Sequence, residues 1–190
     1  MPQLREAVTY PTEDDEWIQT ILIGGVLSIL GFLLIPLLFV YGYVVRGIGR
    51  SLEGDPKPPA FNDWEVLGVD GAKAFLVGVV YMLIPAIVGA LTIGGSILAF
   101  ATETRGGAAT GVAGLIVGTL LTAVLSLVFG YAAVAAIVTY ADARQLGAAF
   151  DLGMLKPIVL SVDYATAWAL SIAVFLGASI LVGVLNGIPI

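Results

Sequence analysis

Long apolar stretches alternate with two polar loops along this chain of 190 residues. The apolar stretches are residues 17–45, 71–100, 108–140 and 164–185, and a helix of about 20 apolar residues is enough to cross a bilayer. The two longest polar interruptions are residues 46–70 and 141–163. The pattern predicts an all-α fold, a polytopic transmembrane helical bundle of about four spans that forms a single domain over residues 1–190.

Each polar loop carries a signal for a short interfacial helix. Residues 54–59 are rich in proline and cannot be helical, whereas Asn62 and Glu65 have the spacing of a capping box for a helix over residues 63–69. In the second loop, Asp151 is placed to cap another short helix. We therefore expect two interfacial loop helices on the same side of the membrane.

Prolines and glycines mark special points within the spans. Pro36 and Pro85 should kink the first and second spans, either for packing or to expose backbone carbonyls to an ion or substrate. Glycines four residues apart in the third span predict helices in close backbone contact, at Gly107/Gly111 and Gly114/Gly118. Serines and threonines inside the spans have no base beside them, so we expect their hydroxyls to bond to helix carbonyls.

The amino-acid composition indicates that this helical protein is an integral membrane protein. Hydrophobic residues make up 59% of the chain and charged residues 12%, with a mean hydropathy of +1.03. Soluble domains contain about 45–50% apolar and about 25% charged residues. The lipid bilayer is thus the expected surrounding, and we expect a cell-membrane, multi-pass protein.

The chain contains neither cysteine nor histidine. Disulfides, thiolate metal sites and the commonest general base are thereby excluded. We predict no catalytic residues, no cofactor and no metal site, and hence a protein that is not an enzyme.

The net charge is −6 and the isoelectric point about 4.4. An acidic, lysine-poor exterior is typical of a host at high salt, although ordinary variation among few loop residues gives the same numbers. Nucleic acid is excluded as a partner because phosphate binding needs a basic face. Residues 1–16 lack the basic and apolar regions of a signal peptide.

Positive charge is unevenly divided between the two predicted sides. The side of the two long loops carries most of the basic residues: Arg46, Arg50, Lys57, Lys73, Arg144 and Lys156. The other side carries Arg5 and Arg105. By the positive-inside rule, the long loops are cytoplasmic and the N-terminus is outside.

Charged and aromatic residues of the first loop form the candidate site. They are Arg46, Asp63, Trp64, Asp70 and Lys73. The four charged residues can form an ion-pair cluster at the interface, either as a headgroup or partner site or as a structural pairing that fixes the loop. The loop also has a possible copy, because residues 60–67 resemble residues 148–155, which suggests two parallel helical hairpins.

The loops resemble a known family. Tyr41-Gly42-Tyr43-Val44-Val45-Arg46, Pro59-Ala60-Phe61-Asn62-Asp63-Trp64 and Val69-Asp70-Gly71-Ala72-Lys73 are similar to the signature of domain-of-unknown-function family 4013. The second loop, with Ala148-Ala149-Phe150-Asp151-Leu152 and Asp163-Tyr164, is similar to that family's second signature. The resemblance implies an uncharacterised archaeal, haloarchaeal-like membrane protein. Such proteins usually have one more hydrophobic segment after residues 187–189, so this chain is a short member or is truncated.

Two functions fit these observations. The first is a non-enzymatic scaffold, envelope component or partner-binding membrane subunit, which acts through helix and loop contacts. The alternative is a small permease or channel-like subunit that works as a homo-oligomer or with another membrane subunit, because four spans scarcely enclose a path.

Overall fold

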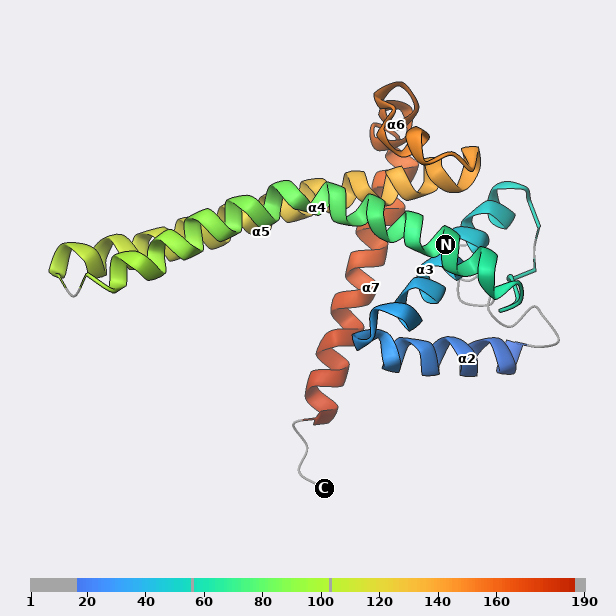
Figure 1. Ribbon diagram of the computed structural model, residues 1–190, viewed down its shortest axis with the longest axis horizontal. Helices are drawn as coiled ribbons and strands as arrows, with labels where there is room; N and C mark the ends of the chain where they lie inside the picture. The colour runs from blue at the N-terminus through green and yellow to red at the C-terminus, as the bar shows by residue number, and fades with distance from the viewer. Residues whose placement is uncertain (1–16, 56, 103, 187–190) are drawn as a thin grey trace.

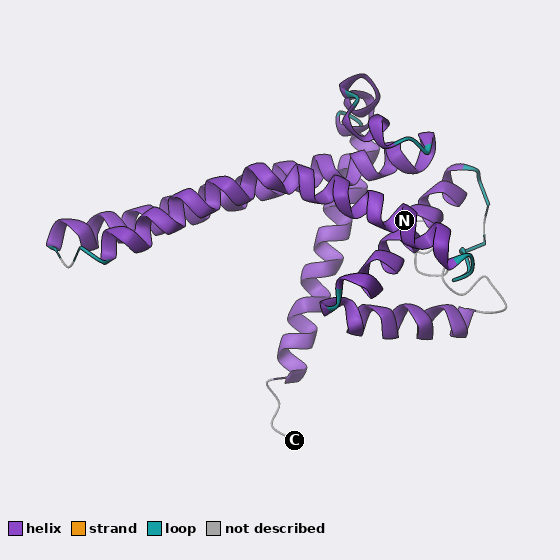
Figure 2. Ribbon diagram, viewed as in Figure 1, coloured by secondary structure: helices purple, strands orange, loops and turns teal. Residues whose placement is uncertain are grey.

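The computed structural model describes residues 17–55, 57–102 and 104–186, so the N-terminal tail lies outside the described residues. Every regular element in these ranges is a helix, joined by short loops (Figure 2). In chain order they are α2 (Trp17–Ile29), the 3₁₀ turn η2 (Leu30–Phe32), α3 (Leu34–Leu52), α4 (Trp64–Phe100), α5 (Arg105–Ala143), the 3₁₀ helix η3 (Leu146–Phe150), α6 (Leu152–Val159) and α7 (Val162–Asn186). The predicted all-α class is confirmed for the described part of the chain.

Helices α4 and α5 form a long antiparallel hairpin (Figure 1). They contain 37 and 39 residues. At 1.5 Å per residue each is about 56 Å long or slightly more, well beyond the roughly 30 Å of bilayer hydrocarbon. The hairpin must therefore tilt or protrude. Thr104 caps α5 at the hairpin tip, where its hydroxyl accepts a hydrogen bond of 2.9 Å from the Gly107 N–H.

The seam of the hairpin is closed by glycines that face hydroxyl side chains. A Cβ atom added to Gly118 would lie 2.7 Å from the Thr92 Cβ, and one on Gly114 would overlap the Ser96 hydroxyl. Thr92 and Ser96 donate to carbonyls of their own helix at 2.7 Å, as expected for hydroxyls in apolar surroundings. The predicted close approach at these glycines is confirmed.

The first predicted span, residues 17–45, is divided into α2 and α3. Leu33 between them is extended, with φ −88° and ψ 123°. Pro36 lies in the first turn of α3, and its ring would clash with the carbonyl of residue 32 if one helix continued through both. The expected kink at Pro36 is thus a complete break three residues earlier, and α2, with 13 residues, is shorter than a span.

The second span begins earlier than predicted. The short helix expected over residues 63–69 and the span over residues 71–100 are one continuous helix, α4. Pro85 is buried inside this helix and does not end it. The second loop does form a separate short helix, α6, so the two loops differ in structure; the internal repeat stays a prediction.

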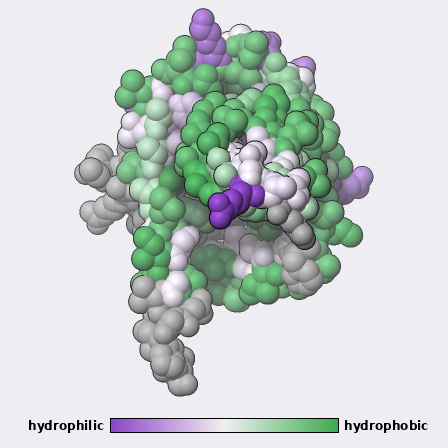
Figure 3. All heavy atoms as spheres, turned by 90° about the vertical axis from the view of Figure 1, so that its left-hand side faces the viewer, coloured by the Kyte–Doolittle hydropathy of each residue, from purple (hydrophilic) through white to green (hydrophobic). Residues whose placement is uncertain are grey.

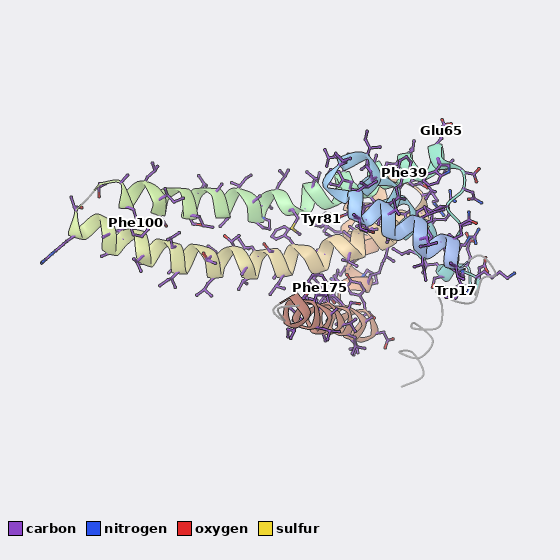
Figure 4. All side chains as sticks on the ribbon, turned by 90° about the horizontal axis from the view of Figure 1, so that it is seen from below. Trp17, Phe39, Glu65, Tyr81, Phe100 and Phe175 are labelled. Carbon is purple, nitrogen blue, oxygen red and sulfur yellow. The ribbon has the colours of Figure 1, made fainter. Side chains whose placement is uncertain are left out.

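Three helices are long and apolar enough to cross a membrane among the described residues: α4, α5 and the part of α7 from Val162 to Gly183. Helix α7 crosses the hairpin steeply, so it is seen nearly end-on in Figure 4, where Phe175 is labelled on it. None of its described side chains is buried. Viewed from the hairpin tip, the visible surface is mostly hydrophobic (Figure 3). A lipid surrounding accounts for such a surface, whereas water does not; the count of four spans stays a prediction.

Candidate functional site

The loop end of the molecule, defined here as residues 46–73 and 140–164, gathers nearly all the described charges. Helices α3 and α4 cross there with their backbones in contact. A Cβ atom on Gly42 would overlap the Leu67 carbonyl, and one on Gly71 would overlap the Leu38 carbonyl. This crossing fixes the positions of Arg46, one turn after Gly42, and Asp70, next to Gly71.

Arg46 fastens the first loop to α3. Its Nη1 donates hydrogen bonds to the Ala60 carbonyl at 3.1 Å, to the Asn62 carbonyl at 3.0 Å and to the Asn62 side-chain oxygen. Arg50, one turn further on, donates to the Pro58 carbonyl at 3.2 Å. Because prolines lack an N–H group, this loop forms few bonds within itself, and the two arginines bind its free carbonyls instead.

Asp70 joins α4 to the end of α5. Its Oδ1 accepts a hydrogen bond of 2.8 Å from the Tyr140 hydroxyl, and its Oδ2 lies 3.3 Å from the Arg144 Nη1. The Asp70 side chain is 15% exposed and that of Arg144 48%. Arg144 ends α5 in the left-handed conformation, with φ 54°, and its guanidinium fits against Gly49, where a Cβ would lie 2.7 Å from its Nη2.

Trp64 belongs to an aromatic group beside this crossing. Its ring lies edge-on to Phe39 at 5.2 Å and stacks on Phe61 at 6.0 Å, and Phe61 in turn stacks on Tyr43 at 4.4 Å. Trp64 itself remains 44% exposed. An amphipathic ring that is half packed and half exposed is typical of a membrane–water interface.

The predicted site residues are near one another in sequence but do not form one ion-pair cluster. Arg46 binds the loop, Asp70 binds Tyr140 and Arg144, and Lys73 has no ion pair within the described residues. Asp63 precedes α4 in the left-handed conformation, with φ 49°, and its side chain does not cap the helix. The predicted capping box is wrong, because the Asn62 side chain binds Arg46 instead.

Sequence reasoning missed the partners of Asp70. Tyr140 and Arg144 lie one turn apart at the end of α5, and that spacing on one helix face was the available signal. They are 70 and 74 residues from Asp70, and only the tertiary arrangement brings the three together.

The second loop is held by tyrosine hydroxyls and one carboxylate. Asp151 caps α6 as predicted, because its Oδ1 accepts a bond of 2.7 Å from the Gly153 N–H. Tyr81 donates to the Ala149 carbonyl and Tyr131 to the Val159 carbonyl, each at 2.8 Å. These bonds tie α6 and η3 to the hairpin.

Two apolar clefts flank Trp168, where α7 crosses α5. The smaller, of about 320 Å³, is lined by Val134, Tyr164, Ala167, Trp168, Ser171, Ile172 and Phe175. The larger, of about 540 Å³, is lined by Leu127, Val128, Tyr131, Trp168, Ala169 and Ile172. Neither is lined by a charged side chain.

Apolar helices longer than a bilayer is thick, with a charged and aromatic layer at one end, define a helical integral membrane protein. The chain matches the family described as protein of unknown function (DUF4013) over residues 26–187. It therefore belongs to that family, as its loop motifs indicated. No curated protein and no solved structure matched it.

Proposed function

We propose that the protein is a non-enzymatic membrane scaffold or partner-binding subunit. The observation that supports this most is the use of polar groups at the loop end. Arg46 and Arg50 are bound to loop carbonyls, and Asp70 to Tyr140 and Arg144. Catalysis needs polar groups that converge on a substrate position, whereas these groups fasten the chain to itself.

The first turns of α4 are the proposed partner surface. Trp64, Val66 and Val69 are each about half exposed, at 44%, 52% and 50%, and Asp63 and Glu65 are exposed beside them. An aromatic anchor among apolar and acidic neighbours suits a membrane subunit with a basic rim. Positive charge on the two loops supports a cytoplasmic location for this surface. The acidic composition supports a halophilic host, and the family resemblance supports an archaeal one.

A small oligomeric permease or channel-like subunit is the second candidate. It is favoured by the break between α2 and α3, where Leu33 is extended. Transporters use such interruptions to present backbone groups to ions or substrates.

Two experiments distinguish the two functions. The first is purification in mild detergent, followed by native mass measurement and partner identification. The second is a measurement of solute flux in liposomes. The scaffold proposal predicts a second subunit that is lost when Trp64→Ala and Glu65→Lys are introduced together, and no flux. A pure homo-oligomer that conducts solute would show that the permease is correct. Trp17→Ala, on the exposed surface of α2, is the control for loss of a tryptophan.

Arg46→Ala tests whether the loop end is structural. Loss of hydrogen bonds from a charged donor should lower the free energy of unfolding by about 1.5–3 kcal/mol. Lys73→Ala, which removes a charge that has no ion pair among the described residues, should change it by less than about 0.5 kcal/mol. The measurement is the thermal unfolding midpoint in detergent. If the Arg46→Ala protein is fully stable but has lost partner binding or solute flux, Arg46 has a functional role and does not serve only to hold the loop.

A further inference from the structure

Aromatic rings lie between α5 and α7 where the two helices cross. The Tyr131 ring lies 4.8 Å from that of Tyr164 and 5.2 Å from that of Trp168, the latter edge to face. The Tyr164 hydroxyl donates to the Tyr131 carbonyl at 2.6 Å, and the Tyr131 hydroxyl to the Val159 carbonyl at 2.8 Å. These bonds fix the rings, and the two clefts beside Trp168 are the spaces that the rings leave.

The hydroxyl groups that line the clefts already have partners inside the protein. Besides the two tyrosine hydroxyls, the Ser171 hydroxyl donates to the Ala167 carbonyl at 2.9 Å. An occupant thus meets carbon almost everywhere. A ligand with its own hydrogen-bonding groups would lose its hydration there without compensation, and apolar cavities do not retain water.

The size of the clefts distinguishes between two apolar occupants, a helix and a hydrocarbon chain. A helix is about 10 Å across and rises 5.4 Å per turn, so one turn fills roughly 420 Å³. Clefts of about 320 and 540 Å³ thus hold about one turn of a helix. A hydrocarbon chain is much thinner and can follow either cleft.

The clefts lie toward the loop end of the two helices that form them. Trp168 is six residues into α7, and Tyr131 is thirteen residues before Arg144 at the end of α5. Tyrosine and tryptophan near the ends of spanning helices usually face the headgroup layer. Here the rings face one another and form walls, and the large cleft opens onto Leu127 and Val128, which are exposed on the apolar surface of α5.

We propose that the two clefts beside Trp168 are binding sites for hydrocarbon chains of membrane lipids, held against the Trp168 indole. This goes beyond the scaffold function and depends only on the membrane class. The bound hydrocarbon chain occupies a defined cleft, whereas the lipid that covers the rest of the helix surface has no fixed position.

Tryptophan fluorescence tests the proposal directly. The chain has three tryptophans, and Trp17 and Trp64 are partly exposed, so the Trp17→Phe/Trp64→Phe protein emits from Trp168 alone. Phosphatidylcholine with brominated acyl chains is titrated into this protein in detergent, with unbrominated phosphatidylcholine as the reference. We expect a saturating loss of emission. Loss that only rises in proportion to the lipid fraction would overturn the proposal.

Filling the clefts supplies the matched comparison. Ala167→Phe with Ala169→Phe places rings in both clefts, whereas Ala173→Phe with Ala178→Phe adds the same rings elsewhere on α7. The filled protein should lose at least about twofold less emission than the control, as expected when a concave site is occupied. Equal loss in the two variants would show that lipid meets Trp168 only as bulk solvent.

A single introduced cysteine tests the other occupant, a second copy of the chain. The protein has no cysteine of its own, so Ala169→Cys gives the only thiol. No disulfide-linked dimer should form in vesicles under oxidising conditions. Efficient linkage would show that a neighbouring copy covers the large cleft, and the proposal would be wrong.

Discussion

Helices α4 and α7 are both long and apolar, but they pack against their neighbours in different ways. Helix α4 meets α3 and α5 through glycines, with backbones close together at Gly71 and Gly118. Helix α7 meets α5 through the rings of Tyr131, Tyr164 and Trp168, with open clefts between. Buried residues occur all along α4, and none is found among the described side chains of α7.

The difference shows what each helix is suited for. In lipid, helices associate by close packing and not by the hydrophobic effect, so the glycine contacts of α4 make α3, α4 and α5 one unit. Helix α7 has little of this packing and depends on a few rings and hydrogen bonds. None of its described side chains is buried, so its whole described surface is available to lipid.

The largest effect is expected from Gly71→Ala, which breaks the crossing of α3 and α4. The new methyl group would overlap the Leu38 carbonyl, and because this is backbone the two helices must separate. We expect a loss of about 3 kcal/mol or more, the upper end for overpacking. In a protein of this size that lowers the thermal unfolding midpoint by roughly 6–12 °C.

Gly78→Ala on the same helix is its control. A Cβ atom there meets nothing within 4 Å, so the substitution should be neutral or slightly stabilising through helix propensity. Equal midpoints for the two variants would show that the crossing is not closely packed in the folded protein.

The next effect is expected from Gly118→Ala in the hairpin seam. Its methyl group would lie 2.7 Å from the Cβ and the hydroxyl of Thr92. Thr92 can move only by giving up its bond to the Val88 carbonyl, so we expect a loss of about 1–3 kcal/mol. Gly130→Ala, whose Cβ would approach only the flexible end of Met82 at 3.7 Å, should leave the midpoint unchanged.

Several contacts set by local spacing could be predicted from the sequence, although the capping box at Asn62 could not, and contacts set by the tertiary arrangement were missed. The glycine repeat at Gly114 and Gly118 and the cap at Asp151 are signals read within one or two turns, and the structure confirms them. The pairing of Asp70 with Arg144 links residues far apart in the chain. No periodicity or cap signal carries the rotation of one helix relative to another.

The first span shows a second limit. A continuous apolar run is equally consistent with one span or with two shorter helices, and hydropathy does not tell them apart. Pro36 indicated a disturbance, but whether the helix bends or ends depends on what can satisfy the freed backbone groups. The Leu33 N–H bonds to the Leu30 carbonyl at 2.9 Å, which stabilises a tight turn and allows a full break.

A smaller effect is expected where α7 is attached. Tyr164→Phe removes the hydrogen bond to the Tyr131 carbonyl and keeps the ring, so it should cost about 0.5–1.5 kcal/mol. Because α7 contributes little to the rest of the fold, we expect increased proteolysis near residues 160–162 with little change in global unfolding. A shift of the global midpoint as large as that of Gly118→Ala would show that α7 is part of the main packed unit.

The smallest effect, of opposite sign, is expected at Thr122 in the hairpin seam. Its hydroxyl is buried against Gly89 and has no hydrogen-bond partner among the described residues, whereas the Thr92 hydroxyl one turn along the seam bonds to Val88. An unpaired buried hydroxyl costs free energy, so Thr122→Val should be neutral or raise the free energy of unfolding by up to about 1 kcal/mol. Thr92→Val removes a satisfied hydroxyl and should lower it slightly. If both substitutions destabilise equally, the Thr122 hydroxyl has a partner in the membrane, and the seam is more polar than its glycines indicate.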